Sequence, residues 1–454
     1  MEGPTTHRDH FLSIFQSAAA SYDRKLAAVR AEGAPEAIGR SSMVDAAAEI
    51  ARLRDEGNTE SPAQPTVREL ERLSPTETAK VCATLGFQYL QAKVAGDTAT
   101  ADRISSELVG ATCDPRWLRT LDEYLKFFGA GGTRRKIPYI RAASAGAQTL
   151  SLASNARIGV IGDWGTGAEP ARRLLTQLKS QNVDTVIHLG DVYYSGTPEE
   201  CKSNFSSILD DVFGKPGKRA QVYTLSGNHD MYCGGVGFYG MIKKLNVDPY
   251  KQPASFFCLR ASDASWQFLA MDTGLHDYSP FSVDDAVPWL EADEEEWHRQ
   301  RLAEFTGKTV LLSHHPLFSR FSRIGKPGSD GKLLPFNPKL RETFDRLRAT
   351  GKPIKAWFWG HEHNLCIYDT YLNLEKGRCL GHSAIPVFSE DDPYEDVENL
   401  VDPPTLIEGT KIGKSEDVWA HGFAVLSLSP QSIAVEYFED RDGVAIRTFQ
   451  ETIA

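Results

Sequence analysis

The sequence has no long apolar run. No stretch of about 18 consecutive apolar residues occurs, so no membrane-spanning helix is expected. The opening residues, MEGPTTHRDHFLSIF, place Glu2 and Asp9 before a short apolar stretch, where a secretory signal would carry positive charge. We therefore expect a cytoplasmic protein that has no membrane partner.

Cysteine is scarce, and its spacing suggests no pairs. The chain has 7 cysteines, an odd number, and contains no C-x-x-C motif, which excludes a disulfide framework and a zinc ribbon. Basic residues are outnumbered, 50 against 61 acidic ones, giving a net charge of -11. An acidic chain argues against broad nucleic-acid binding. The composition is otherwise ordinary for a globular protein.

The chain divides into two parts by pattern. In residues 1–150, Ser74-Pro75-Thr76-Glu77 is a capping box that precedes apolar residues at helical spacing. We predict an α-helical N-terminal extension of unknown role over 1–150, ending in a Ser/Ala-rich link to about Ser154. Residues 151–454 form the second predicted domain, in which apolar strands alternate with helices, a pattern typical of an α/β fold.

Strands are predicted in this second domain wherever a short apolar run occurs. They are RIGVI, DTVIHL, QVYTL, SFFCLRA, WQFLAM, KTVLL, KAWFW, HGFAVLSL and IAVEYFE, with helices at ARRLLTQLKS and ECKSNFSSILDDVF. Chemistry in such folds gathers beyond the carboxyl ends of strands.

Five of these strand ends share one pattern, a small residue followed by side chains that can bind metal. They carry Asp163, then Asp191, then Asn228 and His229, then His314 and His315, and lastly His361 and His363. A lone Gly-Asp after a strand is usually a turn, but five such ends in one chain favour a metal site. Carboxylate, amide and imidazole donors suit iron, manganese or zinc. Two such ions can share a carboxylate, hold a hydroxide and clamp a phosphoryl group, which predicts a binuclear phosphoester hydrolase.

The same motifs, GDWG, LGDVYYSG, GNHD, SHHP and GHEH, resemble the calcineurin-like metallophosphoesterase superfamily. Gly165 stands where that superfamily usually has a histidine, and Tyr194 follows Asp191 by three residues. Both features are similar to purple acid phosphatases of the tartrate-resistant type. The resemblance covers about Ile158 to Leu365 and implies a four-layer sandwich of two mixed β-sheets flanked by helices.

The resemblance also implies a role for each matching residue. Asp163, Asp191, Tyr194 and His363 would bind Fe(III), and Asn228, His314 and His361 would complete a second site for Fe(II), Zn(II) or Mn(II). Asp191 would bridge the two ions. His229 would contact the phosphate or protonate the leaving group, and His315 would touch the substrate, so both are predicted to be catalytic. The implied reaction is attack of metal-bound hydroxide on a small phosphomonoester, with a phosphodiester as the alternative substrate.

Several alternatives stay open. Tyr193 points away from Tyr194 if the strand continues, which favours core packing for Tyr193. Arg320 and the basic residues after it belong either to an anion-binding loop or to a solvated one. The protein is alternatively a cytoplasmic phosphodiesterase acting on nucleotides or cyclic nucleotides, or an interaction protein that acts through its N-terminal helices. The sequence does not indicate the oligomeric state.

Overall fold

The computed structural model describes residues 97, 99–100, 137–193, 195–278, 286–385, 387, 392–415 and 418–454. The capping box at Ser74 and the predicted N-terminal helices lie outside these residues. So does Tyr194.

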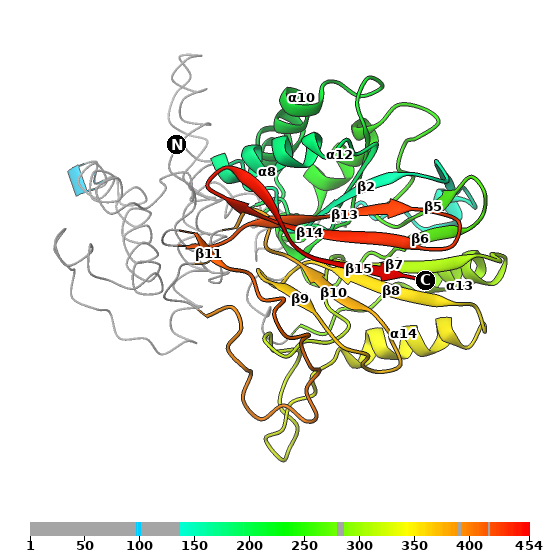
Figure 1. The fold of residues 1–454 in the computed structure, drawn as a ribbon, viewed down its shortest axis with the longest axis vertical. Coiled ribbons are helices and arrows are strands. Elements are labelled where there is room, and N and C mark those ends of the chain that lie inside the picture. The colour runs from blue at the N-terminus through cyan, green and yellow to red at the C-terminus, as the bar shows by residue number, and fades with distance from the viewer. Residues whose placement is uncertain are drawn as a thin grey trace.

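The described part of the chain forms two mixed β-sheets with helices on their outer faces (Figure 1). The first sheet has the order β1-β5-β6-β7-β8-β10-β9 and the second the order β15-β14-β13-β2-β3-β4. In the first sheet the strands are β1 (Leu150–Leu152), β5 (Phe257–Ala261), β6 (Trp266–Ala270), β7 (Lys308–Leu312), β8 (Ile354–Trp359), β9 (Leu365–Ile367) and β10 (Gly377–Leu380). In the second they are β2 (Arg157–Ile161), β3 (Thr185–His188), β4 (Gln221–Thr224), β13 (Gly422–Leu428), β14 (Ile433–Arg441) and β15 (Val444–Ile453). A short pair, β11 (Lys414–Ser415) and β12 (Val418–Trp419), stands apart.

The helices complete the four layers. They are α7 (Ala142–Ala145), α8 (Glu169–Ser180), α9 (Pro198–Glu200), α10 (Ser207–Phe213), α11 (Asn228–Met231), α12 (Val236–Leu245), α13 (Ala292–Ala303) and α14 (Pro338–Arg348). In Figure 1, α8, α10 and α12 cover the second sheet, while α13 and α14 lie beside the first. The predicted fold class, an α/β sandwich of two mixed sheets flanked by helices, is confirmed.

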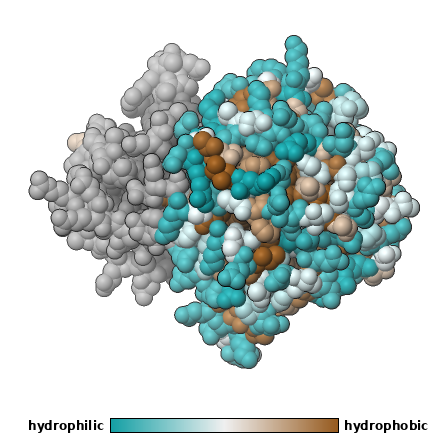
Figure 2. All heavy atoms as spheres, viewed as in Figure 1, coloured by the Kyte–Doolittle hydropathy of each residue, from teal (hydrophilic) through white to brown (hydrophobic). Residues whose placement is uncertain are grey.

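The main core fills the space between the two sheets. Ile158 and Val160 of β2 and Ile187 of β3 meet apolar side chains of β5, β6, β7 and β8 there, all fully or almost fully buried. A second cluster packs the other face of β2 and β3 against α8 and α12. Because β2 and β3 are covered on both faces, they read as continuous apolar runs. The outer surface in Figure 2 is mainly hydrophilic, with small apolar patches, as is usual for a globular fold.

Two segments differ from the sequence expectation. The predicted single helix ECKSNFSSILDDVF consists of the end of α9, the π-helix η2 (Cys201–Ser206) and α10. The Ser/Ala-rich link contains α7 and β1, and the latter pairs with β5 because Leu150 and Leu152 are buried. The Tyr139 hydroxyl, just before this link, donates a hydrogen bond of 2.8 Å to the buried Glu294 of α13.

Candidate metal centre

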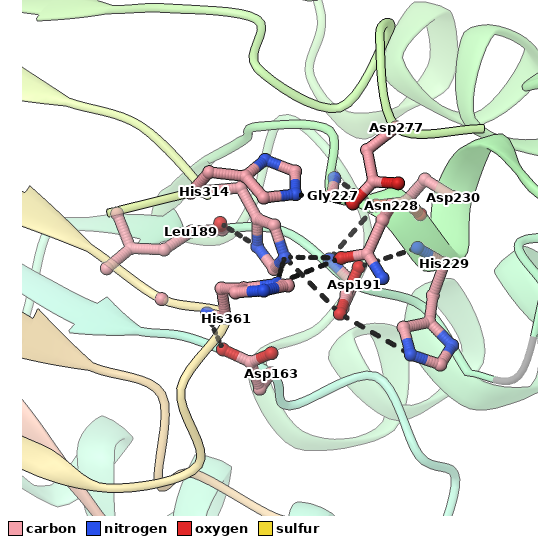
Figure 3. A network of polar contacts seen from close by, with 12 residues as sticks. Asp163, Leu189, Asp191, Gly227, Asn228, His229, Asp230, Asp277, His314 and His361 are labelled. Carbon is pink, nitrogen blue, oxygen red and sulfur yellow. Dashed lines mark hydrogen bonds and ion pairs between the residues drawn. The ribbon is translucent and has the colours of Figure 1, made fainter. Parts of the chain in front are cut away.

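The predicted metal-binding residues follow five strands whose ends meet at one edge of the two sheets. Asp163 follows β2, Asp191 follows β3, and Asn228 opens α11 after β4. His314 follows β7, and His361 and His363 follow β8. Figure 3 shows Asp163, Asp191, Asn228, His314 and His361 directed toward one another. Five of these six side chains are buried, and that of His361 is partly buried.

The backbone at this edge takes unusual angles. Asp163, Asp191 and His361 have positive φ values of 57°, 75° and 68°. Residues other than glycine rarely adopt this region, and such strain gathers at functional sites. Gly227 is required by space, because a Cβ there would lie 2.0 Å from Asp191 Oδ1. The sharp turns aim each side chain back over the strand ends.

Each carboxylate is fixed by one oxygen, and the other oxygen faces the site. The His361 N–H donates to Asp163 Oδ2 at 2.8 Å, and the His229 N–H donates to Asp191 Oδ1 at 3.0 Å. The Asp230 carboxylate accepts the backbone N–H groups of Gly227, Asp191 and Val192. Asp230 therefore holds two of the ligand loops together without being a predicted ligand itself.

The first donor group consists of Asp163, Asp191 and His363. His363 Nε2 lies 3.5 Å from Asp163 Oδ1. Burial, with the charges of Asp163 and Asp230, raises the pKa of the Asp191 carboxyl well above its ordinary value. Among the described residues, no lysine or arginine pairs with Asp163 or Asp191. Two buried carboxylates that no lysine or arginine of the described residues pairs with suit a bound cation, which would favour their ionised form.

The second donor group consists of Asn228, His314 and His361. Asn228 Oδ1 lies 3.0 Å from His314 Nε2 and 3.1 Å from His361 Nδ1, and these two nitrogens are 3.3 Å apart. The Leu189 carbonyl accepts a hydrogen bond from His314 Nδ1 at 2.9 Å, which leaves Nε2 to face the site. Burial lowers the pKa of His314 well below its ordinary value, so the ring is neutral, as a metal ligand must be.

The spacings fit metal ions. Ligand atoms about 2.0–2.2 Å from one ion lie about 3.0–3.5 Å from their neighbours. The donor atoms of both groups have such spacings, and Asp191 Oδ2 lies 3.4 Å from His314 Nε2, which connects the groups. Two sets of three residues have ligand atoms close enough together to hold one ion. They are Asp163 with Asp191 and His314, and His314 with His315 and His361. The donor set is therefore suited to two ions that share Asp191.

The predicted catalytic histidines differ in their surroundings. The His229 ring lies between those of Tyr193 and Tyr232, with Nε2 4.0 Å from Asp191 Oδ2. In His315, Nδ1 is 3.0 Å from Thr273 Oγ1 and Nε2 is 3.1 Å from Asp277 Oδ2. Proton transfer from His315 to a substrate would require one of these hydrogen bonds to open.

Sequence reasoning missed three side chains of the site. The Tyr193 hydroxyl lies among the donors, so its interpretation as a packing residue is wrong. The strand ends at His188, and the alternation argument does not apply beyond that point. Asp277 and Tyr232 had no role in the sequence analysis. The spacing of Tyr232, four residues after Asn228, is a signal that could have found it, since the Asn228 amide donates to its hydroxyl at 2.5 Å.

The basic loop after SHHP is held within the protein at Arg320. Its guanidinium forms two hydrogen bonds, of 2.6 and 2.5 Å, with Asp396 in the acidic stretch after residue 389. The acidic stretch thus pairs with the basic loop at this point, where Arg320 already has an anionic partner.

Comparison with known protein families identifies the part of the chain that contains the predicted ligands. Residues 156–365 match the family model Metallophos, described as calcineurin-like phosphoesterase, and this range contains every predicted ligand. No curated protein matches the chain significantly. In the part of the chain that the structure describes, no helix is both long and apolar enough to cross a bilayer.

Solved structures resemble the chain only distantly. GAP50, the anchor in the inner membrane complex of Plasmodium, has 12% identity and a TM-score of 0.40, over 66% of this chain and 88% of that one. PhoD has 10% identity and a TM-score of 0.40, over 70% and 74%. Vps29 from Cryptosporidium parvum has 14% identity and a TM-score of 0.30, over 66% and 98%. The family match supports a calcineurin-like phosphoesterase domain at residues 156–365, and with it metal-dependent phosphoester hydrolysis as the general reaction.

Proposed function

We propose that this protein is a binuclear phosphoester hydrolase of the purple acid phosphatase type, acting on small phosphomonoesters. One observation carries the proposal. Asp191 belongs to the first donor group, and its Oδ2 also lies 3.4 Å from His314 Nε2 of the second group. A carboxylate oxygen so placed can serve two ions at once, as a two-metal phosphoesterase requires.

The two donor groups favour different ions. Asp163, Asp191 and His363 would hold Fe(III), since oxygen anions suit a small, highly charged cation. Asn228, His314 and His361 would hold Fe(II), Zn(II) or Mn(II). The family resemblance implies one further ligand of the ferric ion, a tyrosine, and by sequence position alone it assigns this role to Tyr194. Bound ions would supply Lewis acidity toward the phosphoryl oxygens and would acidify water.

The protein's own side chains provide positioning and proton transfer. His229 lies beside Asp191 without being one of the donors, and its backbone N–H fixes Asp191 Oδ1. From there its ring can donate a proton to the oxygen of the departing alcohol. His315, held by Asp277 and Thr273, would contact the substrate from beside His314 and His361.

A cytoplasmic location is part of the same proposal. Within the described region, Cys201, Cys258, Cys366 and Cys379 are free and buried. Free thiols are usual in a reduced compartment.

The test is a substrate panel on protein of known metal content. Protein loaded with iron, with iron and zinc, or with manganese is assayed with p-nitrophenyl phosphate, bis(p-nitrophenyl) phosphate and a cyclic nucleotide. We expect the monoester to be hydrolysed fastest by the iron-containing forms. Faster hydrolysis of the diester or the cyclic nucleotide would favour the phosphodiesterase alternative. No hydrolysis by any metal-loaded form would contradict the proposal and favour the interaction protein.

A further inference from the structure

We infer that Tyr193 supplies a phenolate ligand to the first donor group, in the place that the family resemblance gives to Tyr194. This inference rests on the metal centre of the proposed function and names one of its ligands. It is carried by the position of a single atom, the hydroxyl oxygen of Tyr193.

That oxygen is close to one donor atom from each member of the first donor group. It lies 2.9 Å from Asp163 Oδ1, 3.2 Å from Asp191 Oδ2 and 3.1 Å from His363 Nε2. These spacings equal or come close to those of neighbouring ligands on one ion, about 3.0–3.5 Å. With Tyr193 added, the first group offers four donor atoms that approach one another from three chain segments.

Hydrogen bonding by the Tyr193 hydroxyl explains this arrangement less well than metal coordination does. A phenol has one proton and can donate it to one acceptor at a time. The Tyr193 oxygen is surrounded by two carboxylate oxygens and an imidazole nitrogen, all of which are lone-pair donors to a metal. A cation at the centre would accept lone pairs from all four atoms together, and the phenol proton would pass to solvent on coordination.

The backbone of Tyr193 is fixed on both sides, so its hydroxyl is positioned in advance. Its N–H donates to the Gly165 carbonyl at 2.9 Å, and its carbonyl accepts from Asn204 Nδ2 at 2.8 Å. The side chain is 1% exposed, and its ring lies 4.5 Å from that of His229. The sharp turn at Asp191 directs the ring into the site.

Charge also favours a ferric ion at this group. Two carboxylates and a phenolate carry three negative charges, and His363 is a neutral donor when its nitrogen binds a metal. A trivalent cation balances these charges, even though Asp191 is shared with the second group. Hard oxygen anions are the ligands that such a cation prefers.

The experiment compares Tyr193→Phe with its matched neighbour Tyr194→Phe. Both variants and the wild type are loaded with iron, their metal content is measured, and visible and resonance Raman spectra are recorded. We expect the wild type and Tyr194→Phe to show a phenolate-to-iron charge-transfer band with tyrosine ring modes. Tyr193→Phe should lose the band at matched iron content. A band that persists in Tyr193→Phe, or that disappears in Tyr194→Phe, overturns the inference.

This comparison remains decisive if Tyr193→Phe fails to fold, because Tyr194→Phe tests the same point alone. Failure of the inference is also distinguishable from failure of the proposed function. Wild-type protein that binds ferric iron without colour overturns the inference. If the same protein hydrolyses phosphoesters with manganese or zinc, the phosphoesterase function stands. Protein that binds no metal at all overturns both.

Discussion

The two donor groups of the site differ in charge, and this difference indicates how one site can hold two unlike ions. The first group offers the carboxylates of Asp163 and Asp191 with a tyrosine hydroxyl beside them. The second offers an amide and two imidazoles, which are uncharged as metal ligands, and depends on Asp191 for its negative charge. Under the proposed function, the first group would hold the trivalent ion and the second the divalent one.

The largest effect is expected from Asp191→Asn, which removes the carboxylate that the groups share. Both ions would lose a ligand, so activity should fall on the order of 10³-fold, with metal content falling too. The assay is phosphomonoester hydrolysis alongside elemental analysis. Asp211→Asn, at an exposed carboxylate paired with Arg172, is the control and should change neither quantity. Full activity in Asp191→Asn would mean that the groups do not act as one site.

A smaller effect is expected from His229→Gln, which separates proton transfer from metal binding. Both donor groups stay intact, so metal content should be unchanged while kcat falls about 10²-fold. The fall should be smaller for p-nitrophenyl phosphate than for an alkyl phosphate, because a good leaving group needs less protonation. An equal fall for both substrates would contradict a role for His229 as the proton donor.

Tyr232→Phe addresses the second group alone. The Tyr232 hydroxyl accepts from the Asn228 amide and so directs the Asn228 oxygen toward His314 and His361. Loss of this contact should lower the affinity of the second group for its ion by about 10-fold, as loss of a contact to a metal ligand usually does. Competition with a chelator measures this affinity. A lower affinity for the ion of the first group instead would show that the two groups are not independent.

The smallest effect concerns a buried imidazole outside both groups. His188 in β3 donates to Thr224 Oγ1 at 2.9 Å, and burial lowers its pKa to about 3. The unfolded chain takes up this proton below about pH 6.5 and the folded protein does not, so the free energy of unfolding falls as the pH drops from 6.5 toward 3. His188 alone should cost about 2 kcal/mol between pH 7 and pH 5.

Urea unfolding of the wild type and His188→Gln at these two pH values tests this expectation. The variant should lose less stability on acidification than the wild type does. Equal losses would show that another group carries the acid sensitivity. The fold is thus expected to weaken in acid even if the metal centre retains its ions there.

The strand ends were predictable because their pattern is local. A buried strand read as an apolar run, and a glycine or serine before the polar group marked the turn, which located Asp163, Asp191 and His314. The orientation of Tyr193 was not predictable, since it depends on the positive φ of Asp191 and on the carbonyl of Gly165. Strand β15 was missed for a different reason: most of its side chains are partly or fully exposed, so it lacks an apolar pattern.

The π-helix η2 has a consequence for how related sequences should be aligned. A π-helix contains one residue more per turn than the regular helix that it interrupts, and such insertions are frequent near functional sites. Here it carries Asn204, which holds the Tyr193 carbonyl and leaves no room for a side chain at Gly167. An alignment that treats Cys201–Ser206 as ordinary helix would shift Asn204 by one position. If a natural or engineered chain lacked the extra residue of the π-helix, Asn204 would be rotated by about 100° around the helix axis. Its side chain would then no longer hold the carbonyl of Tyr193.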